Sequence, residues 1–429
     1  MDSMPKYASY KDSGVEWLGK LPTEWDLVAN KHIFNLKKNL VGKRSSEYEL
    51  LSLTLKGIIK RDMENPEGKF PAEFDTYQKV NVDDFVFCLF DVEETPRTVG
   101  LSSYDGMITG AYTVFDVKPE YEPRFLYYFY LNLDASKRLK PLYKGLRNTI
   151  SKDAFLSFKT FVPARDGQRA IADFLDQKTA QIDEAIAIKE QQIALLKERK
   201  QIIIQQAVTQ GLDPNVPMKD SGVDWIGKIP EHWEAKRFKY LAKVRYGLGQ
   251  PPKALEGGLK IIRATNVERG KIVEKGMLYV DPKDIPWDRN PELREGEIIV
   301  VRSGAYTGDS ALVTKEYDRT IAGYDMVATP TNCYPNFLSN ALLSKYVLFD
   351  QIYLHRMRSA QPHLNAEELN ELWIAVPPHS EQVEISNYLS KVDDMFESTT
   401  RQLSRQIANL KEYKTTLINS AVTGKIKVA

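Results

Sequence analysis

Two stretches of the chain repeat apolar residues at the seven-residue spacing of a coiled coil. In the first, two adjoining heptad positions carry the apolar set Leu175, Ile182, Ile186, Ile193, Leu196, Ile203 and Ala207. In the second, one position is apolar throughout, at Leu389, Phe396, Leu403, Leu410 and Leu417. Polar residues interrupt the two seams at Lys189, Lys200, Asp393 and Lys414. Because apolar seam positions join helices and polar ones fix register and partner, the pattern predicts two long, specifically paired helices.

The ends of these helices are predicted from capping residues. Asp166 and Ser380 are candidate N-caps, because their side chains can accept hydrogen bonds from the free N–H groups of a first helical turn. Gly211 and Gly424 are candidate stops, because glycine adopts the left-handed conformation that ends many helices. Two matched seams in one chain can pair with each other in antiparallel fashion. A zipper between two copies of the chain is the alternative.

The chain also repeats blocks of sequence in a fixed order. Residues 11–22 recur as residues 219–230 with conservative changes only. Further along, residues 192–198 recur in large part as residues 406–412. Shorter matches are Trp25 with Trp233 and residues 207–209 with residues 421–423. A period this long indicates a duplicated unit of one domain and one helix, not a solenoid of short repeats.

The predicted fold is α+β, with two globular mixed α/β domains joined by two long helices. The helices are expected to form an antiparallel coiled coil, and the repeat implies a pseudo-twofold axis. The predicted segments are a first domain at 1–165, a long helix at 166–212, a second domain at 213–378 and a long helix at 379–429. Within the domains, the divergent parts, about 26–162 and 234–376, are called the first head and the second head.

Both heads mix strand and helix signals. Residues 84–90 and 297–301 read as buried strands, and residues 125–131 and 338–343 as helices. Each head closes with a short helix, one capped by Ser151 and the other by Asn365, which has Glu368 in the capping-box position.

Composition narrows the class of protein. The 429 residues carry a net charge of only +1, from 59 basic and 58 acidic residues, so DNA binding would be confined to one face. The two cysteines lie far apart and form no disulfide framework, and the five histidines show no metal-ligand spacing. With no apolar run of membrane-spanning length and no signal-peptide core at the start, a cytoplasmic location is expected.

Several motifs resemble those of the specificity subunits of type I restriction–modification enzymes. The stretch Val376–Ile385 followed by Leu389 resembles their Pro-Pro…Glu-Gln…Ile start of a helix. The block Gly14…Trp17-Leu18-Gly19…Pro22…Trp25 also looks like theirs, as do residues 262–267 and 296–300. One departure is visible, because the first helix starts with Gly167-Gln168 where the second has Glu381-Gln382.

The resemblance implies a protein that recognises DNA and catalyses nothing itself. Each head would be a target-recognition domain that reads one half of a bipartite, gapped site. The expected partners are double-stranded DNA, two modification (methyltransferase) subunits and restriction (motor-nuclease) subunits. The resemblance implies that S-adenosylmethionine, ATP and Mg belong to those partner subunits and that this chain binds no cofactor or metal.

Two other classes of function compete with this interpretation. A stand-alone DNA methyltransferase or nuclease is disfavoured, because the sequence has neither a P-loop nor an Asn-Pro-Pro-Tyr/Phe segment, and the triplet Glu67-Gly68-Lys69 is a weak nuclease signal. A coiled-coil scaffold whose heads bind proteins stays open.

Candidate DNA-contacting residues lie in polar loops of both heads. Arg, Lys, Asn, Gln and Ser can hydrogen-bond base edges and phosphates, and Tyr can stack on or orient bases. The candidates in the first head are Lys56, Arg61, Arg97, Tyr112, Arg147 and Asn148. Those in the second head are Arg263, Asn266, Arg302, Ser303, Tyr306, Arg356, Arg358 and Gln361. The segments 144–148 and 356–361 occupy matching positions just before the short capped helices and are favoured for groove contacts. For any single arginine, a solvated surface role or an ion pair is the competing interpretation.

Overall fold

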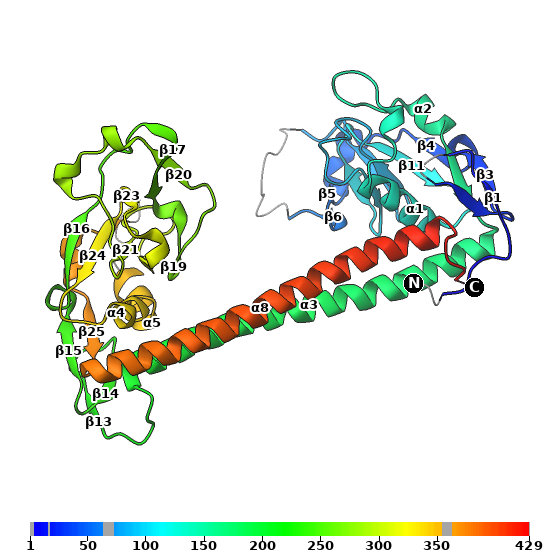
Figure 1. The fold of residues 1–429 in the computed structure, drawn as a ribbon. Coiled ribbons are helices and arrows are strands. Elements are labelled where there is room, and N and C mark those ends of the chain that lie inside the picture. Colours follow the sequence, from blue (N-terminus) through cyan, green and yellow to red (C-terminus); the bar gives the residue numbers. More distant parts are fainter. Residues whose placement is uncertain (1–3, 16–17, 63–72, 354–362, 429) are drawn as a thin grey trace. The chain divides into compact units, whose positions relative to one another are not determined.

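The computed structural model describes the chain except for residues 1–3, 16–17, 63–72, 354–362 and 429. The described part divides into two compact units (Figure 1). The first unit comprises Met1–Lys189 together with Arg405–Ala429, and the second comprises Glu190–Ser404. The triplet Glu67-Gly68-Lys69, His355 and the candidates Arg356, Arg358 and Gln361 lie outside the described residues.

Both long helices predicted from the heptad pattern are present. Helix α3 spans Arg165–Gln210, and helix α8 spans His379–Val422. Each helix begins one residue before its predicted cap, so Asp166 and Ser380 lie in the first turn and not at the N-cap, where helix ends commonly vary by a residue or two. Gly211 and Gly424 adopt the left-handed conformation expected of C-terminal stops, at φ +77° and +69°.

Within each unit, segments of α3 and α8 pack side by side and run in opposite directions (Figure 1). In the first unit, Lys414 Nζ donates to Asp183 Oδ2 at 2.6 Å, and Lys189 Nζ donates to Gln406 Oε1 at 2.7 Å. In the second unit, Lys200 pairs with Asp393. The four polar residues that interrupt the predicted seams are therefore all partnered across the helix pair.

The first head is built on a four-stranded antiparallel sheet. Its strands lie in the order β4-β11-β8-β9, with bounds Phe34–Lys37, Thr113–Val117, Phe85–Phe87 and Val99–Leu101. Strand β3 (Asp26–Ala29) pairs with β12 (Lys159–Val162) where the chain passes into and out of the head. Smaller pairs are β1 (Tyr10–Asp12) with β2 (Lys20–Pro22), β5 (Leu51–Thr54) with β6 (Gly57–Lys60), and β7 (Gln78–Val80) with β10 (Gly106–Ile108).

Helices α1 (Pro123–Ala135) and α2 (Lys152–Ser157) complete the first head. The predicted cap of α2 is confirmed, because Ser151 Oγ accepts from the Ala154 amide at 3.2 Å. The core is aromatic: the ring of Phe34 lies 5.3 Å from that of Phe85, and the ring of Phe87 lies 4.7 Å from that of Phe155.

The second head has a sheet of the same strand order. Its strands run β16-β24-β21-β22, with bounds Ala242–Tyr246, Met326–Pro330, Ile298–Val300 and Ser310–Leu312. Strand β15 (Glu234–Arg237) pairs with β25 (Trp373–Val376) as β3 does with β12. The repeated block forms the hairpin of β13 (Met218–Asp220) and β14 (Lys228–Pro230). The two heads thus share one sheet topology although they share little sequence identity.

A second, three-stranded sheet distinguishes this head. Strand β17 (Ala254–Ile262) pairs antiparallel with β20 (Leu278–Val280) and parallel with β23 (Ile321–Ala322), and β18 (Val267–Glu268) pairs with β19 (Lys271–Ile272). The helices are α4 (Pro335–Leu342), α5 (Lys345–Val347), the π-helical turn Leu348–Ile352 and α7 (Ala366–Asn370). Asn365 and Glu368 form the predicted capping box of α7. The remaining 3₁₀ turns are Asn30–His32, Gly42–Glu47, Lys140–Leu142, Phe238–Tyr240, Ala264–Asn266, Pro282–Asp284, Trp287–Arg289 and Lys315–Tyr317.

The strand and helix expectations for the heads are confirmed, with shorter strands than predicted. The structure thus has the mixed helix and strand content expected from the sequence. No helix in the described part of the chain is both long enough and apolar enough to cross a membrane.

Candidate nucleic-acid interface

A turn before α2 carries two of the favoured candidates of the first head. Lys144 and Thr149 close it with reciprocal backbone hydrogen bonds of 2.9 and 3.0 Å. Asn148 turns the chain with φ +43°, and Leu146 at the tip is fully exposed.

The Arg147 side chain is 69% exposed and pairs with Asp91 at the surface of the head. Its Nε donates to Asp91 Oδ1 at 3.0 Å, and this hydrogen bond lowers the pKa of the Asp91 carboxyl. The same guanidinium lies 5.5 Å from the centre of the Phe90 ring. Phe90 in turn stacks on Tyr112, with ring centres 6.1 Å apart. The structure thus brings Arg147 and Tyr112 together through Phe90, a residue that the sequence analysis missed.

The other three candidates of the first head lie elsewhere. Lys56 is exposed in the turn between β5 and β6. Arg97 Nη2 donates to the carbonyl of Leu55 in the same turn at 3.3 Å, so Arg97 braces the hairpin tip. Arg61 is half-buried just after β6, and its amide donates to the carbonyl of Leu50 at 2.8 Å.

Arg302 of the second head is clamped between two tyrosines. Its guanidinium carbon lies 4.6 Å from the centre of the Tyr246 ring and 4.3 Å from that of Tyr324. Such cation–π contacts hold an arginine in place while leaving its charge intact. The Arg302 amide also donates to Asp325 Oδ1 at 3.2 Å. Arg302 therefore links the end of β21 to the loop that follows β23.

Two further candidates of the second head, Arg263 and Ser303, line one cavity of about 200 Å³. Tyr324 and Asp325, which the sequence analysis did not select, line the same cavity. Burial raises the pKa of the Asp325 carboxyl to about 6, although the Arg302 amide and charge oppose the rise. Asp325 stands out through its burial, which the sequence does not reveal, because no motif surrounds it along the chain.

Asn266 has a structural role that the sequence analysis did not foresee. Its side chain is fully buried, and its Nδ2 donates to the carbonyls of Val273 and Lys275 at 3.2 and 3.1 Å. Its Oδ1 accepts from the Arg263 amide at 3.3 Å. These bonds leave no free edge for a base, so Asn266 shapes the loop that presents Arg263. Tyr306, by contrast, is 51% exposed in the loop between β21 and β22.

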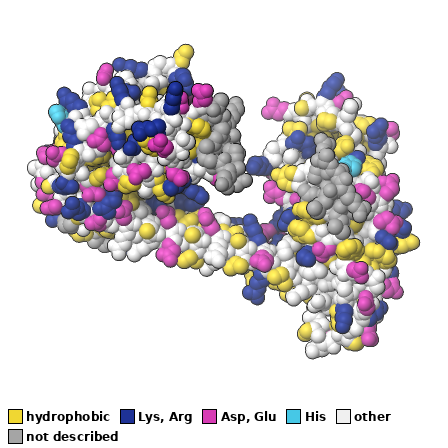
Figure 2. Space-filling model, turned by 180° about the vertical axis from the view of Figure 1, so that it is seen from behind, with side chains coloured by type: hydrophobic (Ala, Val, Ile, Leu, Met, Phe, Trp, Pro, Cys, Tyr) yellow, Lys and Arg dark blue, Asp and Glu magenta, His cyan; other side chains and the backbone are white. Residues whose placement is uncertain are grey.

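On the face that Figure 2 shows, the charged side chains are not gathered by sign. In Figure 2, Lys and Arg side chains are interspersed with Asp and Glu on each unit. In the described part of the chain, no group of three or more His, Cys, Asp or Glu side chains is placed to hold a metal ion.

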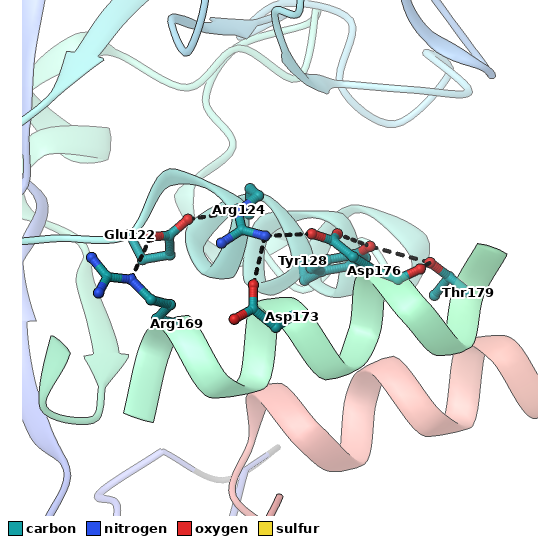
Figure 3. Close-up of polar contacts among 7 residues, drawn as sticks. All are labelled: Glu122, Arg124, Tyr128, Arg169, Asp173, Asp176 and Thr179. Carbon is teal, nitrogen blue, oxygen red and sulfur yellow. Dashed lines mark hydrogen bonds and ion pairs between the residues drawn. The ribbon is translucent and has the colours of Figure 1, made fainter. Parts of the chain in front are cut away.

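An ion-pair network in the first unit anchors α1 of the head to α3 (Figure 3). Arg124 Nη1 donates to Asp173 Oδ1 at 2.8 Å and to Asp176 Oδ2 at 2.7 Å, while its Nε donates to Glu122 at 2.7 Å. These partners, Glu122 first, raise the pKa of Arg124. Tyr128 adds a hydrogen bond to Asp176 at 2.7 Å. A head tied to its helix in this way keeps a fixed orientation on it.

The second unit ties its repeated block to α8 through Glu381. Glu381 Oε2 accepts from the indole N–H of Trp233 at 3.0 Å, and its Oε1 lies 2.6 Å from His232 Nε2. The matching position in the first unit is Gly167, so among the described residues the indole of Trp25 has no such carboxylate. The departure noted in the sequence thus removes one contact at the start of α3.

The geometry can be compared with known proteins. Residues 230–409 match the family model described as the type I restriction modification DNA specificity domain. The chain is 25% identical to the MjaVIII specificity subunit of a type I restriction enzyme from Methanocaldococcus jannaschii, over 71% of this chain and 70% of the relative. It is 24% identical to the EcoBI specificity subunit from Escherichia coli, over 72% of this chain and 66% of the relative.

A solved structure shares the fold. It comes from work on complex assembly and conformational transition of a type I restriction–modification system. The match has a TM-score of 0.67 at 14% identity and covers 94% of this chain and 98% of that chain. Residues 230–409 therefore match the type I restriction modification DNA specificity domain, and the chain is similar over about 70% of its length to specificity subunits of type I restriction enzymes.

Proposed function

We propose that this chain reads a bipartite DNA site, with one head on each half-site and a gap between the two. The observation that carries the proposal is the shared strand order of the two four-stranded sheets, β4-β11-β8-β9 and β16-β24-β21-β22. One frame occurs twice, but the loops on it differ: the first head offers Arg147 over Phe90, and the second offers Arg302 between two tyrosines. Unlike loops on one frame suit two unlike half-sites.

The two long helices would set the gap. We infer that the helix segments paired in each unit continue as one antiparallel coiled coil, with a pseudo-twofold axis relating the duplicated halves. The partnered polar seam residues support this, because matched polar positions fix the register of two helices. A rigid rod of constant length would hold the heads a constant number of base pairs apart.

The chain would act within a complex and catalyse nothing itself. Two modification subunits would bind it and supply S-adenosylmethionine for methylation of adenine, and restriction subunits would supply ATP- and Mg-dependent cleavage. Because all of these act on DNA inside the cell, the complex would work in the cytoplasm. In a stand-alone methyltransferase or nuclease the heads would carry a catalytic site, and in a scaffold they would bind proteins and not DNA.

A methylome tests the proposal directly. The chain is produced together with a type I modification subunit from the same organism, in a host that lacks adenine methylation, and the DNA is sequenced by a method that detects methylated bases. Each subunit alone serves as a control. A two-part gapped motif that is methylated only when both subunits are present is the expected result. Methylation by this chain alone would contradict the non-catalytic role, and no methylation in any combination would favour the protein-binding scaffold.

A further inference from the structure

The cavity of the second head lies where the loop after β23 meets the ends of two other strands. The Gly247 amide donates to the carbonyl of Asp325 at 2.9 Å, and the Gly323 amide donates to the carbonyl of Ile262 at 2.8 Å. Side chains could not replace these glycines freely, because a Cβ on Gly247 would lie 2.0 Å from the carbonyl oxygen of Gly323. The backbone around Asp325 is therefore closely fixed.

Two buried polar atoms of cavity-lining residues have no partner in the described part of the chain. Asp325 is 3% exposed, and its Oδ2 accepts no hydrogen bond although its Oδ1 accepts one from the Arg302 amide. Arg263 donates through Nη2 to the carbonyl of Gly276 at 2.8 Å, but its Nε donates to nothing. An unpaired buried polar group is destabilising, so a folded protein that retains two beside one cavity indicates a ligand.

The ligand must bring a hydrogen-bond donor to a carboxylate. In the major groove, guanine presents only the acceptors N7 and O6, and thymine presents an acceptor and a methyl group. Adenine has an N6 amino donor, but its acceptor N7 lies beside that donor and would repel a carboxylate. Cytosine presents its N4 amino group alone, which makes it the base that suits a carboxylate best. The guanine paired with it offers the acceptors O6 and N7, which suit an arginine.

We propose, on the basis of the DNA-reading function above, that Asp325 selects a cytosine–guanine pair in the half-site of the second head. The Asp325 carboxylate accepts from the N4 amino group of cytosine, and Arg263 donates to the guanine of the same pair. Tyr324, the residue before Asp325, is 46% exposed and lines the same cavity.

The test uses the full chain with its modification subunit and a duplex carrying the motif found by methylome. Each cytosine of the motif is replaced in turn by 2-pyrimidinone, which lacks the exocyclic amino group, and binding is measured. The wild-type complex should lose about 10- to 100-fold in affinity at one cytosine of one half-site. With Asp325→Asn, the same replacement should cost nothing further, and preference at that position should shift towards adenine, which an amide reads through N6 and N7.

The control is Asp288→Asn, an exposed acid of the same head that should leave every preference unchanged. If Asp325→Asn proves unstable, Arg263→Lys provides the second variant and should weaken discrimination at the same base pair only. Equal losses at every cytosine, a half-site without a cytosine–guanine pair, or a full 2-pyrimidinone penalty in Asp325→Asn would each overturn the assignment. A wild-type complex with no sequence preference would instead contradict the proposed function and this inference with it.

Discussion

Lys200 of α3 and Asp393 of α8 form an ion pair at the level where the apolar seam of each helix is interrupted. Both side chains are largely shielded, with 28% and 30% of their surface exposed. Lys271 of the second head approaches the same carboxylate, at 3.5 Å from Asp393 Oδ2. Asp393 therefore joins three elements: the two long helices and the head between them in sequence.

Asp393→Leu should destabilise the second unit by about 1–2 kcal/mol, because two lysines lose their shared acceptor in a partly shielded site. The double variant Lys200→Leu with Asp393→Leu should recover most of the loss, since an apolar seam replaces the pair. Chemical denaturation of both variants measures this. Asp394→Leu, at the exposed neighbouring position, is the control. If the double variant is no more stable than Asp393→Leu alone, the loss in the single variant does not come from leaving Lys200 without its acceptor.

Gly167→Glu should stabilise the first unit by about 1 kcal/mol. The new carboxylate would accept from the indole of Trp25 as Glu381 does from Trp233, and a helical glycine would be removed. The Cβ fits with a small shift, since it would lie 3.1 Å from Pro163 Cβ. Gly167→Ala separates the backbone effect from the new contact. Thermal unfolding that ranks glutamate no higher than alanine would argue against the contact.

Asp325→Asn should raise the free energy of unfolding at neutral pH. Burial raises the pKa of this carboxyl from 3.8 to about 6, despite opposition from Arg302. Because the folded chain holds the proton more tightly than the unfolded chain, the cost of ionisation is full above about pH 6 and absent below about pH 4. The shift of roughly two pKa units corresponds to up to about 3 kcal/mol.

Denaturation of wild type and Asp325→Asn across that pH range measures the difference. The advantage of the variant should be greatest at neutral pH and should disappear as the pH falls towards 4, in about the range given by the two pKa values. Asp288→Asn should show no such trend. A difference that does not change with pH would mean that Asp325 does not titrate as its burial implies.

Inserting one helical turn into α3, with a matching turn in α8, should lengthen the gap in the DNA motif and leave both half-sites unchanged. One turn adds about 5.4 Å, which corresponds to between one and two base pairs along the duplex. The methylome of the variant with its modification subunit provides the measurement. The same insertion in α3 alone breaks the register of the seams and is the control. An unchanged gap in the matched variant would refute the role of the helices as a spacer.

The sequence predicted the elements that depend on local pattern. Heptad spacing and capping residues located α3 to within two residues at each end and the start of α8, and the capping box at Asn365 located α7. The segment 379–429 was predicted as helix to its end, but α8 ends at Val422, just before the predicted stop at Gly424. The common sheet of the two heads was not foreseen, because pairing of distant strands leaves no local signal when side chains differ. The DNA-contacting candidates stay predictions. Selection by residue type singled out Arg263, Arg302 and Ser303 as candidates but not Asp325, because the burial of one carboxyl group leaves no local signal in the sequence.

The pairing of β3 with β12 has an evolutionary consequence. Ala29 and Lys159 lie opposite each other in that pair, as Arg237 and Trp373 do in β15 with β25. The first and last residues of each head are therefore neighbours, so the head is connected to the rest of the chain through one pair of adjacent strands. Everything between those two strands can be exchanged for another sequence of the same topology without lengthening or bending the rest. Recombination at the two ends of one head would therefore replace that head in one step and leave the rest of the chain unaltered.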